Sequence, residues 1–339
     1  MTLRPVIYAP QQENMANIFC QPGTRGDEQN IWHLIQTRFR QHGYELYTPE
    51  NYHGALEDVA WVIFQNMPRD FKPMRLTKRV KRAVNQMLGK GTFYQCCIKA
   101  GLADRIAVAL YEPPIVEEFA YDRKNHCDFT VIFTWSKDLL ELGGRYKEFV
   151  FPQLDTLPLQ PSPHFQDRKL ICNFSANKVS THPDELYTAR IETIKFLEQH
   201  CIDDFDHYGA RWTGEYKSWR GKVENKLATM SNYRFNLCYE NAQNLRGYLT
   251  EKIFDAFHAG CVPIYLGAPD IEDMIPIDTF IDRRRFSSDG ELLEFLRSVD
   301  ESQWRTFIEA ARQYLLSDAH QKYTANGMFS LLKTGLKIS

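Results

Sequence analysis

Short runs of apolar, β-branched and aromatic residues alternate along the chain with longer runs in which apolar residues recur every three or four positions. The short runs are typical of buried strands in parallel sheets, and the longer ones of amphipathic helices. Strands are predicted over 6–9, 44–47, 61–65, 106–111, 129–135, 170–174, 204–208, 235–239 and 262–266. Helices are predicted over 28–42, 76–88, 183–200, 248–259, 291–299 and 303–316. This alternation predicts an α/β protein with doubly wound parallel sheets.

The alternation is interrupted once, by a stretch that contains Pro152, Pro158, Pro161 and Pro163. Proline lacks a backbone N–H and restricts the residue before it, so this stretch favours a linker. A chain of 339 residues is long enough for two domains. We therefore expect a first domain over 1–158, a second over 159–317, and a carboxy-terminal helix or tail over 318–339.

Composition excludes several classes of protein. Apolar residues make up 43% and charged residues 25%, and the net charge is −2, which argues against disorder and against a general nucleic-acid binder. No apolar run approaches the roughly 20 residues that span a bilayer, and the first 30 residues lack the apolar core of a signal peptide. The eight cysteines form no C-x-x-C pair, as is typical of reduced thiols. These features predict a cytoplasmic protein, most readily an enzyme.

The sequence contains no glycine-rich dinucleotide loop, P-loop, nucleophile elbow or H-E-x-x-H zinc motif. The triplet Asp204-Phe205-Asp206 has a form that elsewhere holds a divalent ion and a sugar-nucleotide diphosphate. Because so short a pattern arises by chance and this one continues an acidic loop, we favour a solvated loop. We predict no metal site.

A basic stretch between Phe71 and Ala103 contains eight Lys or Arg and no Asp or Glu. Four of these cations lie on the polar face of the helix predicted over 76–88. The solvent-exposed face of a helix that packs on a sheet explains this pattern. The alternative is peripheral contact of the 72–82 segment with an anionic membrane surface or with an acidic, lipid-linked acceptor.

The segment 233–269 concentrates the candidate chemistry, because a strand, a polar loop and the start of a helix follow one another there. The first turn of a helix that opens at Tyr248 has free backbone N–H groups and a positive dipole end, where a diphosphate can bind. Thr250 can cap this helix and Lys252 adds a positive charge. Glu251 would repel a phosphate and is better suited to accept hydrogen bonds from sugar hydroxyls. The alternative is that both charges belong to an ordinary first turn.

This segment resembles the donor-binding motif of glycosyltransferase family 10, the α-1,3/4-fucosyltransferases. The family pattern is close to F-x-L-x-F-E-N, a short gap, G-Y-x-T-E-K, and then A-G-x-V-P-x-x-x-G. The chain has F-N-L-C-Y-E-N at 235–241, G-Y-L-T-E-K at 247–252 and A-G-C-V-P-I-Y-L-G at 259–267. The strong similarity covers 168–287, and its flanks resemble bacterial members. Ala242 departs from the family, in which serine or threonine is commoner at that position.

The resemblance implies a GT-B fold, in which two doubly wound Rossmann-like domains face each other across a cleft. It implies an inverting transfer of L-fucose from GDP-fucose to a glycan hydroxyl, without a metal cofactor. The 1–158 domain would supply the acceptor side and the base, the 159–317 domain would bind GDP-fucose, and the 318–339 tail would return to the first domain. The expected acceptor is N-acetylglucosamine or glucose of a surface polysaccharide or lipopolysaccharide, in α-1,3 or α-1,4 linkage. Alternatives are another GDP-sugar donor, or a non-catalytic protein that binds nucleotide sugars or glycans.

The resemblance also implies a set of donor-binding residues: Arg220, Asn241, Tyr248, Glu251 and Lys252. Lys252 and Arg220 would hold the diphosphate and stabilise the departing GDP, and the other three would contact nucleoside or sugar hydroxyls. Because the segment around Arg220 aligns loosely with the family, Lys217 and Lys222 are alternatives to it.

An inverting transfer also needs a base that deprotonates the acceptor hydroxyl on the face opposite to GDP. The family takes a glutamate from its first domain, near the end of a strand and in a Glu-Ser-Pro-like context. Glu112 directly follows the strand predicted over 106–111 and precedes two prolines, so we expect it to be the base. Glu117 and Glu118 are the alternatives, and an exposed acid in a strand-ending turn is the non-catalytic interpretation.

Overall fold

The computed structural model describes all residues except 1–2, 12–17, 20–30, 74–90, 156–162 and 339. Its described residues divide into two compact units. Unit 1 comprises residues up to 150 together with those from 325 onward, and unit 2 comprises Phe151–Thr324. The expected domain boundary at 158–159 and the helix predicted over 76–88 lie outside the described residues, as does the start of the helix predicted over 28–42.

Unit 1 is built on a six-stranded sheet in which every pairing is parallel and the strand order is β2-β1-β3-β4-β5-β6. The strands are β1 (Arg4–Ala9), β2 (Tyr44–Tyr47), β3 (Trp61–Gln65), β4 (Ile106–Leu110), β5 (Val131–Thr134) and β6 (Tyr146–Glu148). The helices are α1 (Ile31–Gln41), α3 (Phe93–Lys99), α4 (Pro114–Glu117), α5 (Lys137–Leu140) and α12 (Ala325–Leu336). All five residues of β4 are buried, as expected for a central strand covered on both faces.

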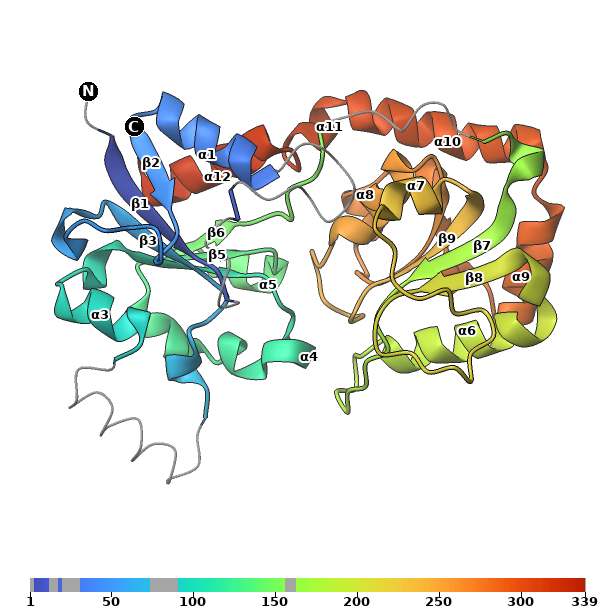
Figure 1. Ribbon diagram of the computed structural model, residues 1–339, viewed down its shortest axis with the longest axis horizontal. Coiled ribbons are helices and arrows are strands. Elements are labelled where there is room, and N and C mark those ends of the chain that lie inside the picture. The colour runs from blue at the N-terminus through green and yellow to red at the C-terminus, as the bar shows by residue number, and fades with distance from the viewer. Residues whose placement is uncertain (1–2, 12–17, 20–30, 74–90, 156–162, 339) are drawn as a thin grey trace. The chain divides into compact units, whose positions relative to one another are not determined.

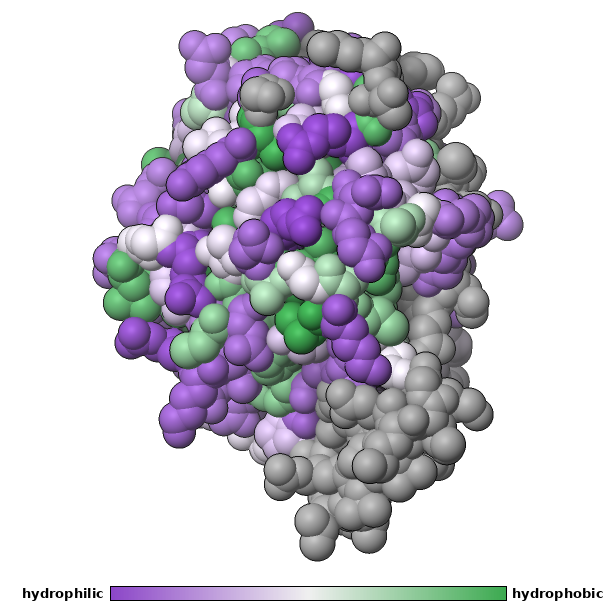
Figure 2. All heavy atoms as spheres, turned by 90° about the vertical axis from the view of Figure 1, so that its left-hand side faces the viewer, coloured by the Kyte–Doolittle hydropathy of each residue, from purple (hydrophilic) through white to green (hydrophobic). Residues whose placement is uncertain are grey.

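Helix α12 lies beside α1 and also contacts β5 and β6, although more than 170 residues of chain separate it from β6 (Figure 1). The rings of Phe329 and Phe39 pack edge to face with their centroids 5.1 Å apart. Gly335 faces the ring of Phe133 so closely that a β-carbon there would lie 2.5 Å from it. Glycine therefore permits the close approach of α12 to the sheet. On the side of unit 1 where β1 begins, hydrophobic side chains gather near the centre of a mostly hydrophilic face (Figure 2).

Unit 2 is built on a five-stranded parallel sheet with the order β11-β10-β9-β7-β8. The strands are β7 (Lys169–Phe174), β8 (Phe205–Tyr208), β9 (Tyr233–Tyr239), β10 (Val262–Leu266) and β11 (Ile281–Asp282). The helices are α6 (Tyr187–His200), α7 (Lys226–Met230), α8 (Glu251–His258), α9 (Asp289–Ser298), α10 (Glu301–Leu316) and α11 (Asp318–Gln321).

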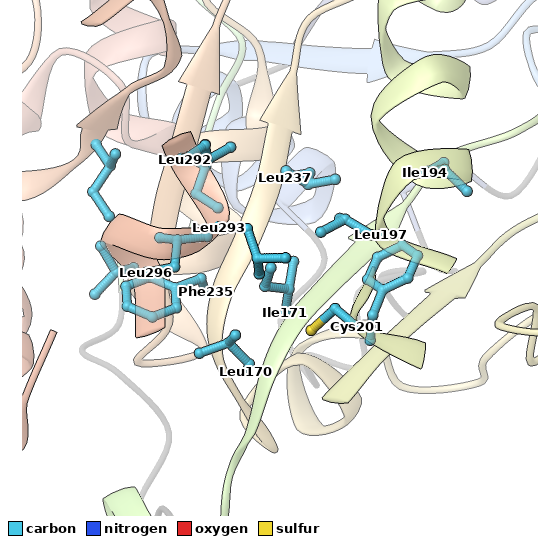
Figure 3. Packing of buried hydrophobic residues seen from close by; sticks show 14 of the residues in the cluster. Leu170, Ile171, Ile194, Leu197, Cys201, Phe235, Leu237, Leu292, Leu293 and Leu296 are labelled. Atoms are coloured by element: carbon cyan, nitrogen blue, oxygen red, sulfur yellow. The ribbon is translucent and has the colours of Figure 1, made fainter. Parts of the chain in front are cut away.

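The main core of unit 2 lies between its sheet and helices α6 and α9 (Figure 3). Strands β7 and β9 supply Ile171 and Phe235, both fully buried, and α6 supplies Ile194. Helix α9 adds a stripe of leucines at 292, 293 and 296, the spacing that places side chains on one helical face. This packing leaves α7 and α8 on the other face of the sheet, where α8 contacts β9 and β10.

Several details differ from the sequence prediction. Helix α8 begins at Glu251 and not at Tyr248, because the Tyr248–Leu249 segment is non-helical and buries both side chains. Helix α6 begins at Tyr187, four residues later than predicted, and β8 begins after Asp204, which lies in a short 3-10 turn. Strands β6 and β11 were not predicted, because two or three residues of mixed polarity carry no strand pattern. Among the residues with assigned positions, no helix has the length and apolarity needed to cross a bilayer.

Candidate active site

The segment 233–269 places a buried glutamate against the first turn of α8. Glu240 directly follows β9 and has no exposed surface. Its carboxylate accepts hydrogen bonds from the backbone N–H of Thr250 at 2.9 Å and from the Thr250 hydroxyl at 2.7 Å, and it forms an ion pair with Lys252 Nζ at 2.8 Å. The carboxyl end of β9 and the amino end of α8 are thereby joined through one carboxylate.

Glu240, Thr250 and Lys252 form what we call the Glu240–Lys252 corner, and Lys252 is held there as a cation. Its side chain is 16% exposed, and its ammonium donates to the Thr250 hydroxyl at 2.9 Å as well as to Glu240. Burial alone would lower the pKa of Lys252, but the nearby Glu240 and Glu251 carboxylates outweigh it, and the pKa lies above its ordinary value. The ammonium therefore stays protonated at neutral pH, fixed at the positive end of the α8 dipole.

The capping hydrogen bond that the sequence suggested for Thr250 is not formed. Thr250 occupies the N-cap position of α8, but its side chain makes no capping hydrogen bond because the hydroxyl donates to Glu240. Glu240 is part of the family motif but was not predicted as a site residue. Its placement could have been inferred from the spacing of the Glu-Asn and Thr-Glu-Lys elements across one strand-to-helix connection.

Arg190 is a second cation at this corner, and sequence reasoning missed it. It lies on α6, is 4% exposed, and donates to the carbonyl oxygens of Tyr239 at 2.9 Å and Glu240 at 2.8 Å. Its Nε is buried without a hydrogen-bond partner among the described residues. Burial lowers the pKa of Arg190 from its ordinary value, and the nearby Glu240 carboxylate opposes this shift. Arg190 sits within a regular helix, so no local motif marks it.

Three further predicted donor-binding residues surround the same corner. Asn241 follows Glu240, is partly exposed, and accepts a backbone hydrogen bond from Leu186 at 3.0 Å. Glu251 is the first residue of α8, with a side chain 33% exposed and 3.9 Å from Lys252 Nζ. Tyr248 is buried, with 2% of its surface exposed. The structure thus brings Glu251 and Lys252 close to Glu240 and its neighbour Asn241, and buries Tyr248.

Arg220 lies elsewhere in unit 2, bonded to Asp206. Its Nε donates to Asp206 Oδ1 at 2.6 Å, and its side chain is 44% exposed. Among the described residues, no hydrogen bond or ion pair connects Arg220 with the Glu240–Lys252 corner. The alternative Lys217 is exposed and accepts a hydrogen bond from Arg220 through its carbonyl oxygen at 3.0 Å, and the alternative Lys222 is exposed on the same segment.

The acidic triplet separates into two environments. Asp206 is buried within β8, where it also accepts from Lys169 Nζ at 2.8 Å and from the Tyr233 hydroxyl at 2.7 Å. Burial would raise the pKa of Asp206, but these hydrogen bonds outweigh burial and hold the pKa below its ordinary value. Asp204 is exposed in the turn before β8. Across the part of the chain that the structure describes, no group of three His, Cys, Asp or Glu residues is arranged to hold a metal ion.

In unit 1, Glu112 stands at the carboxyl end of β4, in a turn fixed by a neighbouring strand. Asn66 follows β3 with a left-handed backbone (φ 62°), and its side-chain oxygen accepts from the backbone N–H groups of Tyr111 at 2.8 Å and Glu112 at 2.9 Å. The Tyr121 hydroxyl donates to the Glu112 carbonyl oxygen at 2.9 Å. These hydrogen bonds hold the backbone of Glu112 in place, and the residue is partly exposed.

Glu117 belongs to the same edge of the unit 1 sheet but is buried. Gln11 donates to one of its carboxyl oxygens and accepts from the Asn66 side chain at 2.9 Å, while the other oxygen of Glu117 has no hydrogen-bond partner among the described residues. Burial raises the pKa of Glu117, and the negative charge of Glu112 raises it further. Glu118, the other alternative base, is exposed.

Comparison with known proteins assigns unit 2 to a family. The profile described as "Glycosyltransferase family 10 (fucosyltransferase) C-term" matches residues 166–329. Unit 2 belongs to glycosyltransferase family 10. The family 10 match contains the whole Glu240–Lys252 corner, together with Arg190 and Arg220.

Similar proteins come from mammals and bacteria. Alpha-(1,3)-fucosyltransferase 7 of Rattus norvegicus is 42% identical over 103 residues, which are 29% of this chain and 28% of that protein. The mouse 4-galactosyl-N-acetylglucosaminide 3-alpha-L-fucosyltransferase 9 is 35% identical over 136 residues, 40% of this chain and 34% of that protein. Alpha-(1,3)-fucosyltransferase FucT of Helicobacter pylori is 37% identical over 75 residues, 22% of this chain and 16% of that protein. The chain therefore spans about a third or less of the length of these relatives.

Solved structures are similar in fold to the whole chain. An α1,3-fucosyltransferase with GDP-fucose superposes with a TM-score of 0.53 at 15% identity, covering 99% of this chain and 90% of that chain. An α-glucosyltransferase in complex with UDP-glucose and DNA has a TM-score of 0.61 at 10% identity, covering 99% of each chain. Both are GT-B enzymes, and the prediction of a GT-B fold with two Rossmann-like halves is confirmed.

Proposed function

We propose that this protein transfers L-fucose from GDP-fucose to a glycan hydroxyl, forming an α-1,3 or α-1,4 linkage. The observation that carries the proposal is the Glu240–Thr250–Lys252 corner in unit 2. It displays a buried ammonium at the amino end of a helix, within a segment that matches family 10. The relatives are named as α-1,3-fucosyltransferases, which favours the α-1,3 linkage.

Loss of GDP places negative charge on the diphosphate oxygen that leaves the fucose carbon. A buried ammonium and backbone N–H groups at a helix start stabilise such charge without rearranging, since they are already in place. We propose that Lys252 and Arg190 supply this charge, with Arg220 and the exposed Lys217 and Lys222 as further candidates. Because cations fixed by the protein do the electrostatic work here, we propose that no metal ion is essential.

The acceptor hydroxyl must lose its proton as its oxygen attacks the fucose carbon from the side opposite to GDP. We propose that the Glu112 carboxylate takes this proton while the bond between that carbon and the GDP oxygen breaks, so that the anomeric configuration inverts. The turn held by Asn66 and Tyr121 supports the assignment, since it fixes Glu112 at the ligand-facing edge of a parallel sheet. Glu117 is the alternative base.

The acceptor is proposed to be N-acetylglucosamine or glucose within a surface polysaccharide or lipopolysaccharide, modified at the cytoplasmic side of the membrane. One relative carries N-acetylglucosaminide in its name, which favours the amino sugar. The 72–82 segment, which the sequence offers as a peripheral membrane contact, lies largely outside the described residues. Membrane contact therefore stays a prediction from the sequence.

A glycan-array transfer assay in EDTA tests the proposal directly. GDP-fucose, GDP-mannose and GDP-arabinose would be compared as donors, and the linkage of the product determined by NMR spectroscopy. We expect transfer from GDP-fucose in EDTA, and loss of transfer in Glu112→Gln. Preferential transfer from GDP-mannose or GDP-arabinose would show that the donor is not GDP-fucose. Binding of GDP-fucose without transfer to any acceptor would favour a non-catalytic binding protein.

A further inference from the structure

Unit 1 has a pocket of about 1090 Å³ that the proposed reaction does not use. It is lined by Trp61, the first residue of β3, by residues 103–104 before β4, and by residues 127–131 at the start of β5. All these positions lie at amino ends of strands, whereas Glu112 follows the carboxyl end of β4. The five residues of β4 lie between the pocket and Glu112. At about 3.3 Å per residue, they separate the two by about 17 Å.

The pocket carries an excess of positive charge in a chain whose net charge is −2. Its cationic side chains are Lys99, Arg145, Lys147 and Lys337, and its acidic side chains are Asp104 and Asp128. Helix α3 contributes Lys99, and Lys337 directly follows α12. Segments far apart in the sequence thus converge with the same sign of charge at one place.

Two of these cations have internal hydrogen-bond partners and two do not. Arg145 donates to the carbonyl oxygens of His126 at 2.7 Å and Phe129 at 2.8 Å, and Lys147 donates to that of Gly144 at 2.8 Å. The side chains of Lys99 and Lys337 are exposed and form no hydrogen bond or ion pair with any described residue. The positive charge of these two ammonium groups is therefore available to a ligand.

Aromatic and aliphatic side chains form the wall beside these ammonium groups. Tyr94 is fixed there, because its hydroxyl donates to Asp128 at 3.2 Å and its ring packs against Phe71 at 5.1 Å. Trp61 adds a second ring, and Ile98 is 40% exposed although it is large and apolar.

We propose that this pocket is a second saccharide site, which binds a segment of an oligosaccharide that bears carboxylate or phosphate groups. Sugar rings have apolar C–H faces that pack on Trp61 and Tyr94. Acidic substituents on those rings pair with Lys99 and Lys337. The site lies at the opposite edge of the sheet from Glu112, so its occupant is a remote part of a long chain or a separate molecule. The inference does not depend on the proposed transfer reaction.

Isothermal titration calorimetry on the full chain tests the pocket with tetragalacturonate as an acidic probe and maltotetraose as an uncharged one. The test variant is Lys99→Glu/Lys337→Glu, whose two positions are exposed and unbonded among the described residues. The matched control is Lys124→Glu/Lys195→Glu, which changes the net charge equally at exposed positions outside the pocket.

We expect tetragalacturonate to bind, maltotetraose to bind at least tenfold more weakly, and GDP not to displace the acidic probe. The test variant should lose at least tenfold in affinity and the control less than twofold. Equal losses in the two variants, displacement by GDP, or no binding of tetragalacturonate would overturn the proposal. Binding to phosphatidylglycerol vesicles in place of tetragalacturonate would also overturn it, because the surface would then recognise lipid.

Discussion

Replacement of Glu240 by glutamine should destabilise unit 2 strongly, because it removes one partner of a buried ion pair. Glu240 has no exposed surface and the Lys252 side chain is only 16% exposed. The introduced glutamine would retain one acceptor oxygen for Thr250 but would turn an amide toward the ammonium. Breaking a buried pair in this way costs about 3–5 kcal/mol, because the remaining charge is left uncompensated. A domain of ordinary stability, about 5–15 kcal/mol, would remain folded at low temperature.

Hydrogen exchange measured by mass spectrometry on peptides of β9 and α8 gives the free energy of opening for unit 2 alone. Lys252→Met should lower this free energy by a similar amount, because it leaves the buried Glu240 carboxylate without its ion-pair partner. In the double variant neither charge remains, so the loss should fall short of the sum of the single losses by about 1–3 kcal/mol. The matched control is Glu251→Gln, whose side chain is 33% exposed and 3.9 Å from the same ammonium.

The control Glu251→Gln should change the free energy of opening of unit 2 by less than about 1 kcal/mol, as is usual for an exposed ion pair. Two results would refute the view that this ion pair organises the corner. One is that Glu240→Gln lowers the free energy of opening by less than about 1 kcal/mol, and the other is that the losses in the two single variants add up strictly in the double variant. The binding of GDP provides an independent readout. It should weaken in both single variants, since each removes either the cation itself or the group that positions it.

Three other substitutions test the remaining carboxylates. Glu112→Gln should lower kcat/KM for transfer by about 10²–10⁴-fold and leave GDP affinity within twofold, as measured by initial rates and calorimetry; unchanged turnover would reject Glu112 as the base. Because burial raises the pKa of Glu117 above 4.5, its ionisation costs stability as pH rises from that value through the folded-state pKa. Glu117→Gln should therefore be more stable than the wild type at pH 8, with a difference that disappears toward pH 4 in urea unfolding; a constant difference would contradict this. Asp206→Asn should cost about 1–3 kcal/mol by hydrogen exchange in β8, because the buried Tyr233 hydroxyl loses a charged acceptor; an unchanged free energy would show that this hydroxyl does not need the carboxylate.

The strand pattern was predictable because buried parallel strands are nearly continuous apolar runs. Three predicted strands, 44–47, 61–65 and 262–266, have the bounds found in the structure. The start of α8 was placed three residues early, because Tyr248 and Leu249 are apolar enough to continue the helical period. Their burial, and not their local preference, decides the conformation there.

The motif around Lys252 was found because its residues are close together in the sequence. Arg190 was not found, since it reaches the same corner from α6, 50 residues before Glu240. The link from Asn66 through Gln11 to Glu117 was missed for the same reason, since it joins residues that follow β3 and β1 to the last residue of α4. Such contacts depend on the order of the strands in the sheet. The periodicity of apolar residues along the sequence predicts the strands but not their order.

The return of α12 to unit 1 has a consequence for how the chain is made. A ribosome would complete every residue of Phe151–Thr324 before it synthesised the helix that packs against Phe39 and Phe133. Within the part of the chain that the structure describes, unit 2 is one uninterrupted stretch and is therefore able to fold during synthesis, whereas unit 1 must wait for its last helix. A truncation after Thr324 would accordingly damage the half of the molecule that was synthesised first, and leave the contiguous half intact.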